Sequence, residues 1–203
     1  MSSRRKGSTS SRNASASPAR HRTISSDAAV IRPPVGRWCR PAAGQSSTSP
    51  PPGPEKEWIQ RITNDTRDVQ ALLFGRRTYE FFAARYSDST STVAELTSGI
   101  PKYVLSSTLT DASWTKTAVL SGDASTEVAK LKADLDGTIV IWASSLLVRE
   151  LIEYDLVDEL RLVVFPIVIG HGARLFGDTT DVKHWRLAAT ETVGDLVYLT
   201  YRR

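Results

Sequence analysis

Cysteine and histidine are scarce in this chain, and long apolar runs are missing. Its single cysteine, Cys39, cannot form a disulfide within the chain. The three histidines lie neither in a His-Glu-x-x-His pattern nor beside paired cysteines, so the sequence predicts no metal site. No apolar run approaches the roughly 20 residues needed to span a bilayer, and no apolar signal segment follows the basic start. We therefore expect a cytoplasmic protein without membrane contact.

The common nucleotide-binding and hydrolase signatures are also absent. The chain contains no G-x-G-x-x-G, no G-x-x-x-x-G-K-[ST] and no G-x-S-x-G sequence. These absences argue against a standard Rossmann site, a P-loop and a hydrolase nucleophile elbow. The hydrophobic content of 40% is nevertheless enough for one ordinary core.

Positive charge is concentrated in the first quarter of the chain. Residues 1–54 contain nine lysines and arginines and one acidic residue, Asp27, whereas the remainder is acidic overall. A basic segment can neutralise nucleic-acid phosphates. This one has no aromatic interleaving beyond Trp38 and no helical periodicity. We therefore interpret it as a solvated tail and expect no nucleic-acid partner.

The composition also places a domain boundary near Glu55. Residues 1–54 are rich in serine, proline and arginine and end in Ser-Pro-Pro-Pro-Gly-Pro. Such a composition buries too little apolar surface to offset the entropy lost on ordering. We predict a disordered tail over residues 1–54 and a single domain over residues 55–203.

Within residues 55–203, apolar patterns typical of strands alternate with patterns typical of helices. The apolar run at residues 138–143 predicts a buried strand, and the apolar stripe of residues 147–152 predicts an amphipathic helix behind it. Further strands are expected at residues 69–74, 102–107, 117–123 and 159–169, further helices at 55–65, 79–86 and 125–135, and a hairpin from 185–193 and 196–203. This order predicts a mixed α/β sheet covered by helices on both faces.

Three turns after predicted strands carry residues suited to binding an anion. Where a chain turns into a helix, free N–H groups and the helix dipole attract negative charge. The first turn, Gly75 to Thr78, combines a glycine, two arginines and a hydroxyl that also suits a helix cap. The second covers residues 106–108 and the third residues 143–146. Each is also explained as an ordinary turn or, at Ser144 or Ser145, as an ordinary helix cap.

The motifs GRRTYE, SSTL, IWASSLLVREL and DLVDELRLVVFPIVIGHGARLF occur in this order between Val69 and Arg203. In these motifs the chain resembles the dihydrofolate reductase-like superfamily, and in particular the reductase domain of bacterial bifunctional riboflavin-biosynthesis enzymes. The resemblance implies a three-layer α/β fold with a mixed, mostly parallel central sheet, helices on both faces and a C-terminal β-hairpin. The last of the four motifs is specific, and we interpret its role as mainly structural.

The resemblance also implies an NADPH-dependent reductase that transfers hydride to a pterin- or aminopyrimidine-like small molecule. The protein's own task is then mainly to position cofactor and substrate. The implied cofactor contacts are Gly75, Arg76, Arg77, Thr78, Ser106, Ser107, Ser144, Ser145 and Leu146. No catalytic or substrate-binding residue is assigned, and water or an unidentified carboxylate would supply the proton.

Two departures from the family pattern leave a second hypothesis open. Ala143 stands where relatives commonly have glycine, and its methyl narrows the approach of a pyrophosphate. The family also begins with a central strand that runs into a Leu-Asp-Gly-like loop, whereas residues 23–31 are only weakly strand-like, so we expect this strand to be missing. A mistranslated or misassigned start and a rebuilt terminus both explain this. The alternative is a non-catalytic or impaired descendant with an incomplete nicotinamide and substrate pocket.

The remaining candidates carry weaker signals. Glu55 and Glu57 stand at roughly the distance before the first turn where some relatives place a substrate-binding carboxylate, but a charged first helical turn has the same sequence. His171 is more simply explained as a variable loop residue. An unpaired edge in a shortened sheet, together with dimers among relatives, leaves a homodimer open.

Overall fold

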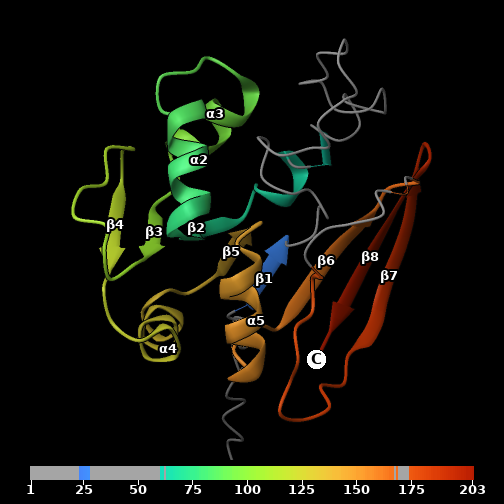
Figure 1. The fold of residues 1–203 in the computed structure, drawn as a ribbon. Helices are drawn as coiled ribbons and strands as arrows, with labels where there is room; N and C mark the ends of the chain where they lie inside the picture. The colour runs from blue at the N-terminus through green and yellow to red at the C-terminus, as the bar shows by residue number, and fades with distance from the viewer. Residues whose placement is uncertain (1–22, 28–59, 62, 167, 169–173) are drawn as a thin grey trace, which may run out of the picture.

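The computed structural model describes residues 23–27, 60–61, 63–166, 168 and 174–203 (Figure 1). Disorder was predicted for residues 1–54: residues 23–27 form a strand instead, whereas residues 1–22 and 28–54 lie outside this part. Cys39, Glu55, Glu57 and His171 lie outside it as well. No helix in the described ranges is long and apolar enough to cross a membrane.

A single mixed sheet forms the centre of the fold (Figure 1). Its strands are β1 (Thr23–Asp27), β2 (Val69–Gly75), β3 (Lys102–Leu105), β4 (Thr117–Leu120), β5 (Thr138–Trp142), β6 (Glu159–Val164), β7 (Arg186–Val193) and β8 (Leu196–Arg202). They lie in the order β4-β3-β2-β5-β1-β6-β8-β7. The pairs among β1 to β6 are parallel, and β8 runs antiparallel to both β6 and β7. The predicted mostly parallel sheet with a C-terminal hairpin is confirmed.

Helices cover the two faces of this sheet and enclose two separate cores. The helices are α2 (Arg76–Tyr86), α3 (Thr92–Ser98), α4 (Ala124–Asp134) and α5 (Ser145–Glu153). In β2, Leu73 packs in a core with α4 and α5, whereas Leu72 and Phe74 pack in the opposite core with α2. This alternation follows from the two-residue period of a strand. The three-layer arrangement is therefore as predicted, although α3 was not expected.

The structure corrects the expectation that the domain lacks a first, central strand. β1 lies between β5 and β6, with Thr23 level with Thr138 and Asp27 level with Trp142. The sheet therefore includes residues upstream of the boundary that we placed near Glu55. A buried parallel strand usually reads as a continuous apolar run. The sequence TISSD does not, which is why residues 23–31 gave only a weak strand signal.

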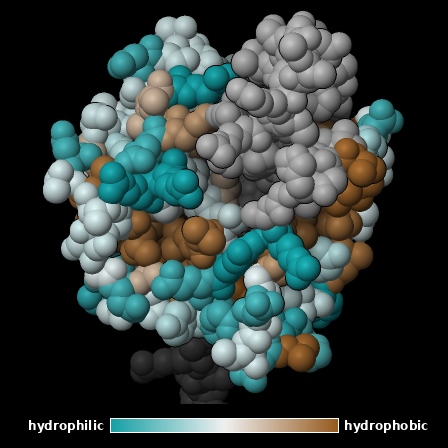
Figure 2. Space-filling view, in the orientation of Figure 1, coloured by the Kyte–Doolittle hydropathy of each residue, from teal (hydrophilic) through white to brown (hydrophobic). Residues whose placement is uncertain are grey.

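β7 forms the outer edge of the sheet, next to β8. Seven of its eight residues are exposed, and Leu187 keeps 52% of its surface accessible. The space-filling view shows hydrophobic groups on the side of the molecule where this hairpin lies (Figure 2). A homodimer stays a prediction, which light scattering of the purified chain would check.

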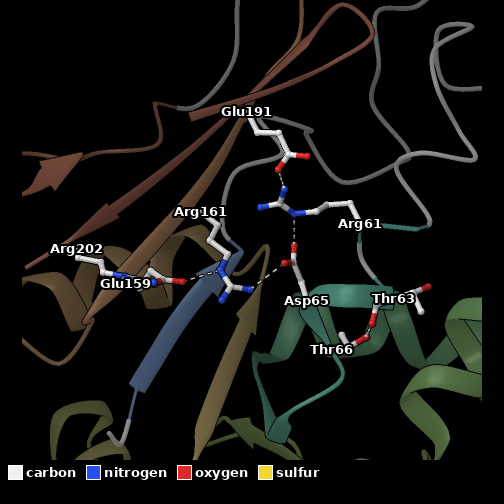
Figure 3. A network of polar contacts seen from close by, with 8 residues as sticks. All are labelled: Arg61, Thr63, Asp65, Thr66, Glu159, Arg161, Glu191 and Arg202. Carbon is white, nitrogen blue, oxygen red and sulfur yellow. Dashed lines mark hydrogen bonds and ion pairs between the residues drawn. The ribbon is translucent and has the colours of Figure 1, made fainter. Parts of the chain in front are cut away.

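A network of ion pairs ties the helical residues around Arg61 to the C-terminal strands (Figure 3). Arg61 pairs with Asp65 over 2.9 Å and with Glu191 of β7. The other Asp65 oxygen lies 3.4 Å from a guanidinium nitrogen of Arg161. Arg161 and Arg202 each donate to Glu159 over 2.6 Å.

Glu159 is the buried centre of this network, with a side chain only 5% exposed. Burial alone would raise the pKa of its carboxyl group. The hydrogen bonds and charges of Arg202 and Arg161 outweigh that effect and lower the pKa. Glu159 lies in the motif DLVDELRLVVFPIVIGHGARLF, which we interpreted as mainly structural. The network agrees with that role.

Candidate functional site

The three predicted turns meet at one edge of the sheet. β3, β2 and β5 are adjacent and parallel, and the turns follow their carboxyl ends at Gly75, at residues 106–108 and at residues 143–145. In parallel α/β sheets, ligands bind outside the carboxyl ends of the strands. The structure thus brings the implied cofactor contacts together from three distant parts of the chain.

The first and third turns are joined by a direct hydrogen bond. The backbone N–H of Gly75 donates to the Oγ atom of Ser144 over 3.0 Å. Ser144 is itself only 8% exposed. It occupies the N-cap position of α5, but its side chain makes no capping hydrogen bond to that helix. The alternative interpretation of Ser144 as an ordinary helix cap is therefore wrong, because its hydroxyl is engaged with the neighbouring strand.

The first and second turns are joined through Arg76. Its guanidinium donates to Thr108 Oγ1, and its Nε atom donates to Glu80 Oε1 over 2.7 Å. Within the second turn, Ser106 Oγ accepts the N–H groups of Thr108 and Leu109 over 3.2 and 3.0 Å. The Ser106 hydroxyl therefore organises its own turn, and Arg76 holds that turn beside the start of α2.

The remaining predicted contacts lie around this centre with different degrees of exposure. Arg77, Ser107 and Leu146 are exposed, and Leu146 keeps 67% of its surface accessible although it is apolar. Thr78 does not cap a helix, since α2 begins at Arg76 with Gly75 as its N-cap residue. Thr78 lies instead in the first turn of α2.

The N-termini of α2 and α5 differ electrostatically from those of the other helices. Neither has a side-chain cap or an acidic residue in its first turn. By contrast, α3 is capped by Ser91 and α4 by Asp123, and each carries a glutamate in its first turn. A helix N-terminus bears positive potential and unpaired N–H groups. Within the described ranges, neither of these two ends has a capping side chain or a first-turn carboxylate to compensate that potential.

At Gly75, a Cβ atom would make only ordinary van der Waals contacts between the two helix ends. The Gly75 φ of −79° is accessible to any residue, and the nearest atoms that an added Cβ would meet are 3.9 Å away, on Leu147 and Ser144. Neither the backbone nor the packing of the chain therefore requires glycine here. A missing side chain does allow the close approach of a phosphate to the backbone.

The third turn departs from what its conformation favours. Ala143 has φ 55° and Ser144 has φ 28°, a region that glycine adopts far more readily than other residues. A glycine at position 143 would suit this backbone better. The Ala143 methyl group is exposed and lies beside the site. An alanine in place of glycine at position 143 therefore affects both the backbone strain of the turn and the space for a ligand.

One acidic residue near this edge was missed by sequence reasoning. Asp27 ends β1, and its backbone is level with Trp142, directly before the third turn. Its place at the carboxyl end of a central strand could not be recognised while β1 itself was not. The only signal was that Asp27 is the sole acidic residue in the first 54 positions.

A sequence profile identifies the family of this chain. The sequence profile of the RibD C-terminal domain matches residues 40–199, most of the chain. The chain belongs to the RibD C-terminal domain family. This match begins upstream of the predicted boundary near Glu55 and includes all three turns. A RibD C-terminal domain has the reductase-type fold that the sequence motifs implied.

Two Bacillus subtilis (strain 168) proteins are similar in sequence. YwjB, an uncharacterized protein, is 35% identical over 75 residues, which are 37% of this chain and 43% of YwjB. YyaP, also uncharacterized, is 25% identical over 136 residues, or 64% of this chain and 72% of YyaP. The match therefore spans less than half of YwjB and a larger part of YyaP.

Two solved structures illustrate this fold. A putative riboflavin biosynthesis protein from Shewanella sp. PV-4 has a TM-score of 0.63 at 23% identity, covering 89% of this chain and 96% of that protein. Dihydrofolate reductase from Enterococcus faecalis, complexed with NADP(H) and RAB-propyl, has a TM-score of 0.54 at 17% identity, covering 90% and 96%. These similarities establish the dihydrofolate reductase-like fold.

Proposed function

We propose that this RibD C-terminal domain is an NADPH-dependent reductase of a small pterin- or aminopyrimidine-like substrate. The observation that carries the proposal is the meeting of two uncapped helix N-termini at the Gly75–Ser144 hydrogen bond, with Arg76 beside them. An extended ligand with several phosphates suits such an edge, because each helix end and each guanidinium can bind one anionic group. NADPH would supply the hydride.

In this proposal, two parts of the edge hold different parts of the cofactor. Gly75, Ser144, Ser145 and Leu146 surround the N-termini of α2 and α5, which would bind the pyrophosphate. The ribose phosphate would lie toward β3, where Arg76, Arg77, Thr78, Ser106 and Ser107 offer guanidinium and hydroxyl donors. These residues bind and orient the cofactor, and the proton for the substrate comes from water or from a carboxylate.

Proteins with a similar fold support the same chemistry. The Enterococcus faecalis reductase was solved with NADP(H). A Thermotoga maritima protein named as a deaminase and 5-amino-6-(5-phosphoribosylamino)uracil reductase has a TM-score of 0.51 at 12% identity, covering 70% of this chain and 48% of that protein. The rival hypothesis, an impaired descendant, depended on a missing central strand and on Ala143. With β1 in the centre, Ala143 is its remaining support.

A titration followed by a turnover assay tests the proposal. NADPH binding is measured by the change in its fluorescence on adding the full chain, with NADH as a comparison. The oxidation of NADPH is then followed at 340 nm, a wavelength at which the oxidised cofactor is transparent, in the presence of dihydropteridine or aminouracil compounds. We expect the chain to bind NADPH and to oxidise it at a slow to moderate rate in a buffer near neutral pH. An absence of binding at millimolar NADPH would reject the proposal.

A further inference from the structure

Ser144 has a hydrogen-bonding role that differs from that of the other serine at a helix start. Ser91 caps its own helix, since its Oγ atom accepts the N–H of Ala94 over 3.3 Å. Ser144 stands at the same position of α5, yet its Oγ atom accepts the N–H of Gly75, 69 residues away in the chain. The Ser144 side chain therefore connects the end of β2 to the start of α5 and does not cap α5.

The place of this bond matters because Gly75 and Ser144 are the N-cap residues of α2 and α5. One hydrogen bond of 3.0 Å thus links the two helix starts directly. Ser144 is more than nine-tenths buried, and Leu147 of α5 packs within 4 Å of the space beside Gly75. Both helix ends are therefore fixed against each other by a part-buried contact.

The serine hydroxyl retains a proton after this bond is made. A hydroxyl group has one donor hydrogen and two acceptor lone pairs, and Gly75 uses one of the lone pairs. The hydroxyl hydrogen is not used by this bond, so it stays available as a donor.

We infer that Ser144 is a positioning residue that sets the spacing of the two helix N-termini for one shared anionic group. This inference rests on the proposed function, since the anion is taken to be the pyrophosphate of NADPH. It adds a role that the sequence did not suggest: the affinity for the cofactor depends on a bond within the protein. Loss of the hydroxyl should loosen the spacing and weaken binding without unfolding the domain.

The experiment compares S144A and S144G with wild type and with S91A. Both Ser144 variants lose the bond to Gly75, but glycine also relieves the positive φ at this position, so S144G should be at least as stable as S144A. S91A removes a matching serine Oγ acceptor at the start of α3, which lies outside the site. Each full chain is titrated with NADPH, melted thermally, and examined for hydrogen exchange of the Gly75 amide.

We expect both Ser144 variants to raise the Kd for NADPH by about five- to tenfold, since a net hydrogen bond corresponds to about that factor. Exchange of the Gly75 amide should become faster in both. S91A should melt earlier and bind NADPH as wild type does. If wild type binds NADPH and S144G binds it equally well, the positioning role is overturned while the proposed function stands. If wild type does not bind NADPH, the proposed function fails first.

Discussion

The backbone N–H of Trp114 donates to the hydroxyl group of Tyr79 over 3.0 Å. Both side chains are almost fully buried, with exposed fractions of 3% and 2%. Tyr79 belongs to α2, which starts at the first turn of the site, and Trp114 ends the connection that carries the second turn. The bond therefore fixes these two turns relative to each other from beneath the surface.

Replacing Tyr79 by phenylalanine tests this support. Y79F leaves the buried N–H of Trp114 without its acceptor, which should lower the free energy of unfolding by about 1–3 kcal/mol. NADPH affinity should fall as well, since the second turn is less firmly held. Urea unfolding measures the first effect. Y103F is a suitable control, because Tyr103 is only partly buried in the opposite core, and equal stability of the two variants would contradict the account.

Lys102 gives a prediction in the alkaline range. Its side chain is fully buried, and its ammonium group donates to the main-chain oxygens of Thr97, Ile100 and Thr115. It also lies over the ring of Trp114, 4.7 Å from the centroid. Burial, together with the charge of Lys116, lowers the pKa of Lys102 to about 8 from its ordinary 10.5.

Between these two pKa values the unfolded chain binds more protons than the folded chain. The free energy of unfolding therefore rises with pH from about 8 to about 10.5, by an amount on the order of 2 kcal/mol. K102M should lack this contribution, and K130M, which changes an exposed lysine, should keep it. Unfolding curves at several pH values from 7 to 11 provide the comparison. A parallel pH dependence in wild type and K102M would show that Lys102 does not titrate in this way.

Glu159 gives a dependence of the same sign in the acidic range. Its pKa is lowered in the folded state, so its ion pairs stabilise the fold above the ordinary value of 4.5, and this stability is lost as pH falls further. E159Q leaves the partly buried Arg161 without that carboxylate and should cost about 3 kcal/mol at neutral pH. This loss of stability is at the lower end of the range for broken buried ion pairs, because the Arg202 side chain is 60% exposed.

Acid unfolding distinguishes Glu159 from ordinary carboxylates. The deficit of E159Q relative to wild type should shrink as the pH drops below about 4.5, since protonation removes the same charge from wild type. E127Q, which affects an exposed pair with Lys130, should stay within about 0.5 kcal/mol of wild type. A deficit of E159Q that is constant with pH would contradict the lowered pKa.

Gly75 and Gly99 form a matched pair for testing the site. Both have ordinary negative φ values, and an added methyl group meets nothing closer than 3.9 Å at Gly75 and nothing within 4 Å at Gly99. G75A and G99A should therefore both be as stable as wild type or slightly more stable. Only G75A should weaken NADPH binding, by tenfold or more, because its methyl occupies the approach to the helix ends. Equal NADPH affinities in both variants would place the phosphates elsewhere.

Much of the fold could be predicted from the sequence, because its elements carry their own patterns. β5 is a continuous apolar run, and α5 has an apolar stripe in register, so both were recognised close to their observed bounds. β1 was missed because TISSD is polar and its place depends on pairing with two strands distant in the chain. No local pattern contains that information.

The residue types of the site could be predicted from the sequence, but the hydrogen bonds between its turns could not. The small and basic residues after β2, β3 and β5 marked the three turns, and their meeting follows from parallel neighbouring strands. The partner of Ser144 was not predictable, since its position at a helix start equally suits a cap. The burial of Lys102 and Glu159 likewise depends on tertiary contacts, and both residues have side chains that usually stay exposed.

The central claim is that NADPH binds where the three turns meet, and an NMR titration of the isotopically labelled full chain tests it most directly. NADPH is added stepwise and the shifts of the backbone amide signals are followed. The account predicts that the largest shifts fall on residues 75–78, 106–108 and 144–146, with a common dissociation constant. Shifts confined to other parts of the chain, or no shifts at millimolar NADPH, would contradict it.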